Sequence, residues 1–261
     1  MRTRLNLLFL KFRYLYSRLI QGLVEKQLRK RFVAINPSQV DVQWKLKYDE
    51  QDIYGIFDYK DEDWNQVVNL DVLMLMHSFG LYKGEKRSFI PIDENNRKIY
   101  KDIENHLKVS SQGLSNDWIY LTTYHKEFCN CRLSVTIRFD SIFKEFQIAY
   151  RHHSLFERLR FRIVDGNEIV SEVVTKGFFS NPIHKIPFAL EISKVYKIDL
   201  YCIDGNYSFA INDEVKMTIR DTKYEKEQGE LAIVFWDDKP QSNIRAEMLH
   251  YGIYEINNQA I

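Results

Sequence analysis

The chain has 261 residues, 45% of them apolar, which is enough to bury a substantial core and excludes a disordered tail. Its 37 Lys and Arg side chains nearly balance its 36 Asp and Glu, so the formal net charge is only +1. This balance argues against a surface built to neutralise phosphates, and we expect no nucleic-acid partner. The 17 Phe and 16 Tyr, with only ten Gly and five Pro, favour β-sheet and exclude collagen-like chains.

The beginning of the chain is predicted to form a basic amphipathic helix over residues 1–35. Residues 1–32 carry nine basic side chains and one acid, Glu25. Apolar residues recur there at the spacing of one helix face, with basic residues seven apart on the opposite side. The apolar stripe includes Leu8, Phe12 and Leu19, and the basic face includes Arg4, Lys11 and Arg18.

This helix has two interpretations. It could anchor the protein at a membrane surface, with its basic face towards anionic lipid. Alternatively, residues 1–32 could dock on the β domain, a second subunit or another protein partner, as most amphipathic helices do. No stretch approaches the roughly 20 apolar residues that span a bilayer, and the apolar run at 5–10 is too short for a secretory signal.

From Trp118 onwards, apolar and polar residues alternate, which predicts half-buried strands. The clearest strand covers residues 132–139, and the same period returns at 146–151, 159–163, 196–201, 207–211 and 231–236. The turn signals Asp165-Gly-Asn, Asp204-Gly-Asn and Asn212-Asp separate several of them. Residues 36–261 are therefore predicted to form an all-β antiparallel sandwich, best supported over 116–258.

Residues 36–115 give a weaker pattern. The apolar run at 67–76 is consistent with further strands, and residues 98–107 fit either a short helix or an edge segment. Pro37 disfavours helical geometry at Asn36, so the boundary between helix and sandwich is predicted there.

The order of features from Trp118 to Ile256 resembles the concanavalin A-like lectin/glucanase jelly roll, especially its bacterial, laminin-G-like sugar-associated branch. These features are the Trp118-Ile-Tyr-Leu-Thr-Thr-Tyr segment, the strand from Phe128 to Arg138, the hairpin Asp204-Gly-Asn-Tyr-Ser-Phe-Ala-Ile-Asn212, the segment Gly229-Glu-Leu-Ala-Ile-Val-Phe and the last strand, Ala246 to Ile256. The resemblance implies two curved sheets whose concave face holds carbohydrate in many members, some of which are glycoside hydrolases.

The family's hydrolase pattern, a Glu-x-Asp-x-Glu strand, is absent from the sequence. That strand places carboxylates on one face, where retaining hydrolysis needs them about 5 Å apart. Acids such as Asp199 and Glu172 are isolated on their predicted strands. The sequence therefore favours a non-catalytic carbohydrate-binding module, with a divergent glycoside hydrolase and an assembly subunit as alternatives.

Arginine replaces acid on the polar faces of the predicted strands. If these faces share one concave sheet, they form a basic surface suited to an acidic glycan, because guanidinium forks pair bidentately with carboxylates. Aromatic rings nearby would stack on sugar rings. The predicted ligand-binding residues are Arg132, Arg138, Arg151, Arg158, Arg160, Arg162, Trp118, Tyr150 and Trp236. The alternative is a solvated face whose arginines pair with acids such as Glu168 and Glu172.

No metal or cofactor is predicted. Cys129-x-Cys131 lacks the Cys-x₂₋₄-Cys spacing of zinc sites, and Asp237-Asp238 falls far short of the six to eight oxygen ligands that Ca²⁺ takes. Together with Cys202, the cysteines form no even disulfide set, so we interpret them as reduced thiols of a cytoplasmic protein. Lipid binding by the helix would place that protein at the periphery of a membrane.

Overall fold

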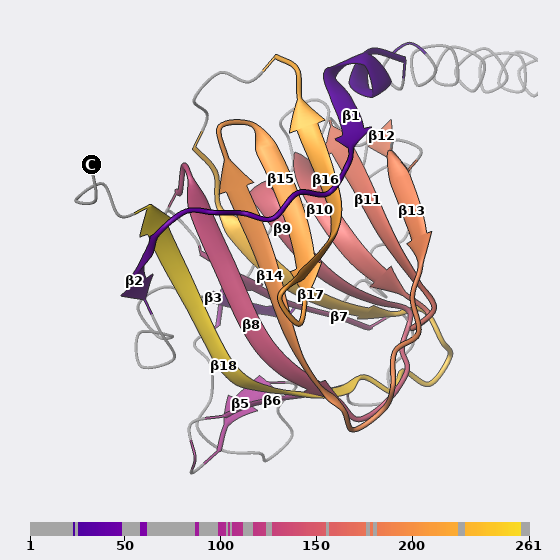
Figure 1. Ribbon diagram of the computed structural model, residues 1–261. Coiled ribbons are helices and arrows are strands. Elements are labelled where there is room, and N and C mark those ends of the chain that lie inside the picture. Colours follow the sequence, from indigo (N-terminus) through magenta and orange to yellow (C-terminus); the bar gives the residue numbers. More distant parts are fainter. Residues whose placement is uncertain are drawn as a thin grey trace, which may run out of the picture.

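Two antiparallel sheets packed face to face form the molecule in the computed structural model (Figure 1). The structure describes residues 23, 26–48, 58–61, 87–88, 99–102, 104, 106–111, 117–123, 127–154, 157–175, 178–179, 182–223 and 228–256. The predicted all-β antiparallel sandwich is confirmed.

Sheet A runs in the order β1 (Phe32–Ile35), β16 (Glu214–Asp221), β15 (Asn206–Ile211), β14 (Val195–Ile203), β8 (Cys131–Phe139), β18 (Arg245–Ile256), β6 (Leu107–Ser110) and β5 (Ile99–Lys101). A further strand, β2 (Trp44–Tyr48), also pairs with β18. In Figure 1 sheet A faces the viewer. Residues 98–107, for which the sequence left two structures open, contribute the edge strand β5 and the first residue of β6. The apolar run at 67–76, which is predicted to contribute further strands, lies outside the described residues.

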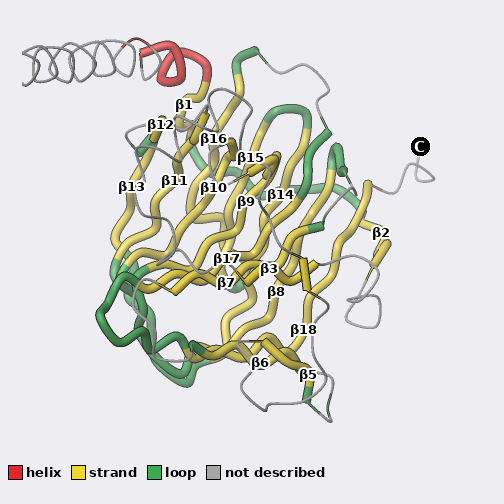
Figure 2. Tube along the Cα trace, turned by 180° about the vertical axis from the view of Figure 1, so that it is seen from behind, coloured by secondary structure: helices red, strands yellow, loops and turns green. Residues whose placement is uncertain are grey.

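Sheet B runs in the order β12 (Phe178–Phe179), β11 (Glu168–Thr175), β10 (Glu157–Val164), β9 (Glu145–Ser154), β17 (Leu231–Asp237), β7 (Asp117–Thr122), β3 (Asp58–Asp61) and β4 (Arg87–Ser88). The strand β13 (His184–Pro187) also pairs with β11. Seen from behind, this sheet is the nearer layer (Figure 2).

Alternation along the strands fills the space between the sheets with apolar side chains. Leu133, Val135 and Ile137 of β8 are completely buried. Aromatic rings join the layers: Phe161 of β10 stacks on Phe209 of β15, with ring centroids 5.5 Å apart and planes at 8°. The burial of these apolar side chains is the main favourable contribution to folding.

The hairpin turns have the geometry that their sequences predict. Asp165 and Gly166, Asp204 and Gly205, and Asn212 and Asp213 all have positive φ. These pairs connect β10 to β11, β14 to β15 and β15 to β16. Two consecutive residues in the left-handed region match the twist of the flanking strands, which is why Asn, Asp and Gly occur there.

The predicted N-terminal helix is described only near its end, at 26–31. Its predicted contact residues, Arg4, Leu8, Lys11, Phe12, Arg18 and Leu19, lie outside the described residues. Residues 32–35, which the sequence assigned to the helix, form β1 instead, because Phe32 buries its ring and Val33 and Ile35 favour extended backbone. No helix in the described part of the chain has the length and apolar character needed to cross a bilayer.

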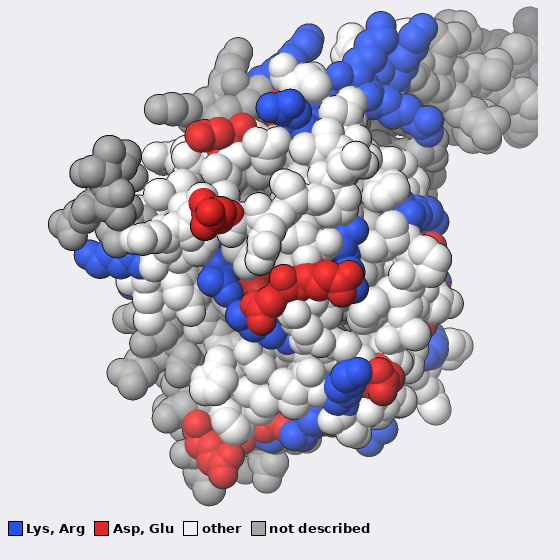
Figure 3. Space-filling model, in the orientation of Figure 1, with Lys and Arg blue, Asp and Glu red and all other residues white. Residues whose placement is uncertain are grey.

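The helix end is fixed to sheet A. Arg31 donates from Nε and NH2 to the buried carboxylate of Asp221, at 2.9 and 2.8 Å, and the Thr222 hydroxyl donates to the carbonyl oxygen of Arg31. Figure 3 shows basic side chains gathered at this corner. The described helix end itself carries Lys26, Arg29 and Lys30, which are exposed, and Arg31.

A strap, residues 36–43, joins β1 to β2 across the outer face of sheet A, the face that points away from sheet B (Figure 1). From β1 to β2 the sheet order spans six strand spacings, roughly 29 Å at 4.8 Å each. The nine Cα steps from Ile35 to Trp44 reach at most about 32 Å. The strap must therefore run almost fully extended.

Candidate functional site

The structure divides the predicted arginine set between the two sheets. Arg132 and Arg138 lie on β8 of sheet A, whereas Arg151 on β9 and the alternating arginines of β10 belong to sheet B. The polar faces of two sheets that share a core point away from each other. The expected single basic surface is therefore not formed by this set. For Arg151 and Arg158 the structure gives only the strand on which each residue lies.

Of the predicted aromatic residues, Tyr150 is separated from the two tryptophans. Tyr150 points into the core, where only 2% of it is exposed and its hydroxyl donates to the carbonyl oxygen of Phe128 at 2.8 Å. Trp236 is partly exposed and is the Cα partner of both Trp118 on β7 and Glu145 on β9. The two tryptophans thus share one cross-strand row of sheet B with a glutamate.

A closed polar cluster, here called the sheet B network, lies on the outer face of sheet B. It consists of Glu145, Gln147, Arg160, Arg162 and Glu172. Arg160 donates from Nε to Glu172 Oε2 at 2.8 Å and from NH1 to Gln147 Oε1 at 3.1 Å. Gln147 donates to Glu145 Oε2 at 2.6 Å, and Arg162 donates from NH1 to Glu145 Oε1 at 2.5 Å.

The sheet B network is buried and balanced in charge. Gln147 is 0% exposed, Glu145 2%, and Arg160 and Glu172 4% each. Burial lowers the pKa of Arg160, although the charges of Glu172 and Glu145 oppose that change. Two guanidinium groups face two carboxylates, so the sheet B network itself carries no net charge. The predicted alternative is correct in pairing Arg160 and Arg162 with Glu172, but it expected a solvated face, whereas this network is buried.

Sequence reasoning missed Glu145 and Gln147. The predicted strand began at Phe146, one residue late, so the Glu145-x-Gln147 alternation was not recognised as a polar pair on one face. An i, i+2 pair of polar residues at the start of a strand is the signal that could have found them.

The positions of the two glutamates bear directly on hydrolysis. Arg162 contacts both, with NH1 on Glu145 and NH2 3.6 Å from Glu172 Oε2. A hydrolase keeps the space between its two carboxyl groups for the scissile bond and a water molecule, and one carboxyl must hold a proton. Here a guanidinium occupies that space and its N–H groups face both carboxylates.

Arg162 retains an unused donor. Its Nε is buried and has no hydrogen-bond partner among the described residues, while 13% of the side chain is exposed. An unsatisfied buried donor costs roughly 1–3 kcal/mol, which a ligand acceptor or a water molecule would recover.

The predicted arginines of sheet A have their own acidic partners. Arg132 donates from Nε to Asp199 Oδ1 at 2.9 Å, and Arg138 donates to Asp140 Oδ1 at the same distance. Arg138 also lies 2.5 Å from Glu247 Oε2. Hydrogen bonding to Asp140 raises the pKa of Arg138 despite partial desolvation.

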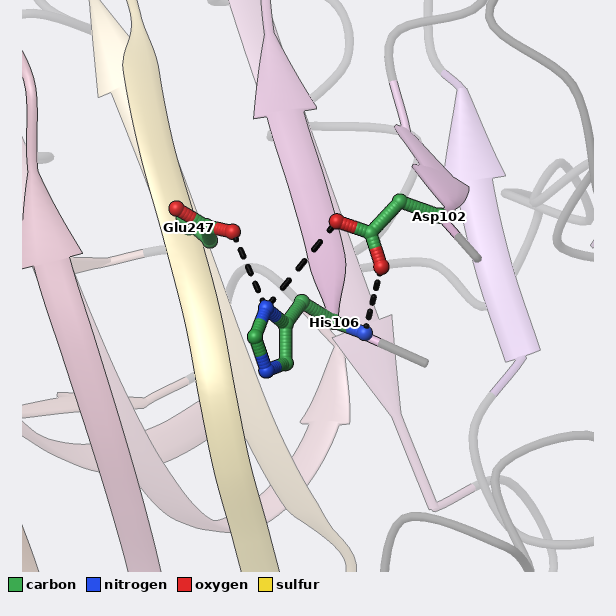
Figure 4. Close-up of side chains that lie close together, drawn as sticks. All are labelled: Asp102, His106 and Glu247. Carbon is green, nitrogen blue, oxygen red and sulfur yellow. Dashed lines mark hydrogen bonds and ion pairs between the residues drawn. The ribbon is translucent and has the colours of Figure 1, made fainter. Parts of the chain in front are cut away.

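Glu247 belongs to a second titratable cluster, with Asp102 and His106 (Figure 4). His106 Nδ1 lies 3.1 Å from Glu247 Oε1 and 3.9 Å from Asp102 Oδ2. Asp102 Oδ1 accepts the backbone N–H of His106 at 2.9 Å. Desolvation alone would raise the pKa of Asp102, but backbone N–H donation from His106 and Glu104, with Lys108 nearby, lowers it overall.

The spacing of these three residues would suit a metal, but their neighbours already supply positive charge. Lys108 donates to Glu247, and its Nζ lies 3.4 Å from Asp102 Oδ2. With Arg138 on the other Glu247 oxygen, the cluster is an ion-pair network that ties β6 to β18 and β8. Of the acids considered for Ca²⁺, Asp237 is buried and accepts the Asn243 backbone N–H at 3.0 Å. Asp238 is exposed.

No protein-family model and no curated protein matches the sequence. Among solved structures, an endo-β-1,3-glucanase from Pyrococcus furiosus aligns with a TM-score of 0.56 and 9% identity, covering 86% of this chain and 98% of that one. The fold is a concanavalin A-like jelly roll.

Two further matches are weaker. The carbohydrate-binding module CBM66 from Bacillus subtilis gives a TM-score of 0.43 and 10% identity over 62% of this chain and 89% of that one. A Caenorhabditis elegans galectin, LEC-6, gives a TM-score of 0.38 and 13% identity over 62% of this chain and 99% of that one. The predicted jelly-roll architecture is confirmed by the glucanase match alone, and at 9% identity that likeness concerns only the fold.

Replacing Glu172 with Gln removes the main counter-charge of a buried guanidinium. We expect the Glu172→Gln variant to lose roughly 3–5 kcal/mol of unfolding free energy, measured by urea denaturation. The matched control is Glu168→Gln on the same strand, because Glu168 pairs with Lys185 at the surface and should contribute less than about 1 kcal/mol. Equal losses in both variants would contradict the account of Arg160.

The low pKa of Asp102 predicts a pH-dependent contribution to stability. A folded-state pKa below the usual 3.8 means that the carboxylate stabilises the fold above that pH and loses this contribution as the pH falls through the folded-state pKa. We expect Asp102→Asn to lose up to about 1 kcal/mol at pH 7 and progressively less below pH 3.8, in urea titrations at several pH values. A loss that does not change with pH would contradict this prediction.

Proposed function

We propose that the protein is a non-catalytic carbohydrate-binding module whose ligand binds on the outer face of sheet B, beside Arg162 and Trp236. The observation that carries this proposal is the buried Arg162 Nε, which has no partner among the described residues. It belongs to a guanidinium already fixed by Glu145, so little conformational entropy is lost when a ligand hydroxyl accepts its hydrogen.

The tryptophan supplies the second element of sugar recognition. Trp236 is partly exposed, and it is the cross-strand neighbour of Glu145, which Arg162 contacts. A sugar ring on the indole would have its hydroxyl groups beside the guanidinium edge. The glucanase that shares this fold acts, by its name, on a β-1,3-glucan, which supports saccharides as the class of ligand to test.

For this site we propose a neutral saccharide in place of the acidic glycan that the arginine pattern indicated. Glu145 and Glu172 neutralise both buried guanidinium groups, so an additional carboxylate would meet two like charges. The same pairing argues against the alternative of a divergent hydrolase, because the Arg162 guanidinium lies between the two glutamates.

The test is binding to an array of neutral and acidic glycans, followed by calorimetry on the best neutral oligosaccharide. Loss of the Trp236 ring in Trp236→Ala should weaken binding about tenfold or more. Arg162→Lys keeps the positive charge but loses Nε and the planar fork, and we expect a similar loss. Arg220→Gln, on the exposed outer face of sheet A, is the matched control and should bind like the wild type.

Two outcomes would refute this function. If Trp236→Ala and Arg162→Lys both bind the oligosaccharide with wild-type affinity, the proposed site on sheet B is wrong. Release of reducing ends from the bound oligosaccharide, abolished by Glu145→Gln, would establish the hydrolase alternative.

For the N-terminal segment we propose docking on an anionic membrane surface. The support is the excess of basic residues in 1–32 and the fixed position of the helix end, where Lys26, Arg29 and Lys30 are exposed and Arg31 is paired with Asp221. Such a basic cluster gains roughly 1 kcal/mol per charge close to anionic lipid.

We expect the full chain to sediment with phosphatidylserine-containing vesicles at low salt and to be released at high salt. A chain lacking residues 1–25 retains Lys26, Arg29, Lys30, Arg31 and β1 but loses the other five basic residues and the apolar stripe, so it should sediment much less than the full chain. Equal sedimentation of both chains would refute the anchor. A concentration-dependent mass that the deletion abolishes would support the assembly role instead.

A further inference from the structure

An arginine on the outer face of sheet A is held in an unusually restricted environment. Arg132 on β8 has Tyr201 of β14 and Tyr254 of β18 as its cross-strand partners. The guanidinium carbon lies 5.3 Å from the centre of the Tyr201 ring and 5.0 Å from that of Tyr254. Both contacts are in the range of cation–π interactions, which fix the group between the two rings.

The hydrogen-bonding edges of this guanidinium are not equally used. Nε donates to Asp199 Oδ1 at 2.9 Å. Within the described residues, neither terminal nitrogen donates a hydrogen bond, and 15% of the Arg132 side chain is exposed. Hydrogen bonding to Asp199 raises the pKa of Arg132 although burial opposes it. The terminal edge is therefore a charged planar fork without an acceptor, the geometry that matches a carboxylate bidentately.

Asp199 adds a second unmet requirement next to the fork. Its side chain is 0% exposed, and its Oδ2 has no hydrogen-bond partner among the described residues. A buried carboxylate oxygen needs a donor. A simple anion could satisfy Arg132 but not Asp199, whereas a ligand that carries both a carboxylate and hydroxyl groups could satisfy both.

Aromatic rings surround this place and are held in position. Trp44, at the end of the strap, has its ring centroid 5.8 Å from that of Tyr201. A Cβ on Gly252 would lie 3.0 Å from Tyr254 Cε2, so the absence of a side chain there lets the Tyr254 ring lie against β18. All three rings are partly exposed and can offer apolar faces to a sugar.

We propose that Arg132, Asp199, Tyr201 and Tyr254 form a second binding site, which takes the carboxylate of a uronic acid residue in a saccharide. The carboxylate bonds to the terminal edge of Arg132, and an adjacent hydroxyl group donates to Asp199 Oδ2. This site lies on the opposite face of the sandwich from the sheet B network. Its saccharide character rests on the proposed function, whereas its selectivity for a carboxylate rests on the geometry of Arg132.

The experiment is calorimetry on the full chain with disaccharides of galacturonic and glucuronic acid, and with their neutral galactose and glucose counterparts. We expect at least one uronic disaccharide to bind about tenfold or more tightly than its neutral counterpart. Arg132→Lys should abolish this difference, because lysine keeps the charge but not the planar fork. Arg220→Gln removes an exposed arginine from the same face of sheet A and should leave the difference intact.

A variant that leaves the Arg132–Asp199 pair in place guards against misfolding. Tyr254→Leu removes one covering ring and should weaken binding of the uronic disaccharide several-fold. The proposal is overturned if no uronic disaccharide binds, if the preference over neutral sugars persists in Arg132→Lys, or if a glutamate dipeptide binds as tightly.

Trp236→Ala separates the two sites, because this substitution should weaken the binding of neutral saccharides and leave the binding of uronic saccharides unchanged. Loss of both ligands in Trp236→Ala would contradict a separate site.

Discussion

A buried guanidinium needs its charge and its N–H groups compensated, and Arg160 imposes this constraint on sheet B. Only 4% of the residue is exposed, so water cannot supply the compensation. Glu172 and Gln147 supply it from the neighbouring strands, and Gln147 in turn bonds to Glu145. These contacts leave the sheet B network without net charge, and both of its carboxylates are paired with guanidinium groups. This pairing is the reason for proposing recognition in place of acid catalysis on this face.

The strands were predictable because alternation is a local property. Each residue of β8, β10 or β14 points to one side of its own strand, and the sequence alone identifies that side. The sheet to which a strand belongs depends on distant pairing: β8 and β9 follow each other in the chain but lie in different sheets. Arg132 and Arg160 therefore look equivalent in the sequence, although they point in opposite directions from the core.

The strap illustrates a second limit of local prediction. Pro37 marks the end of helical geometry, but nothing near it indicates that the next residues cross a whole sheet. That path follows from the pairing of β1 with β16 and of β2 with β18, near opposite sides of sheet A. Because the chain between them is nearly as short as the distance allows, the position of Trp44 is coupled to both ends. Arg31 and Asp221 fix one end and Trp44 contacts Tyr201 at the other, so the strap leads from the end of the N-terminal helix to the aromatic group around Arg132.

Arginines on the two faces differ in the partners that surround them. Arg160 bonds to Glu172 and Gln147 and has no exposed edge, so it serves the fold. Arg162 shares two carboxylates and lacks only an acceptor for Nε, which a neutral hydroxyl can provide. In the described part of the chain Arg132 has one ionic partner, Asp199, and the rings of Tyr201 and Tyr254 cover its faces, so an acceptor can approach only in the plane of the guanidinium. A carboxylate meets that requirement with two parallel bonds and a hydroxyl with one. The same residue type therefore leads to two different proposals, a neutral sugar beside Arg162 and an acidic sugar beside Arg132.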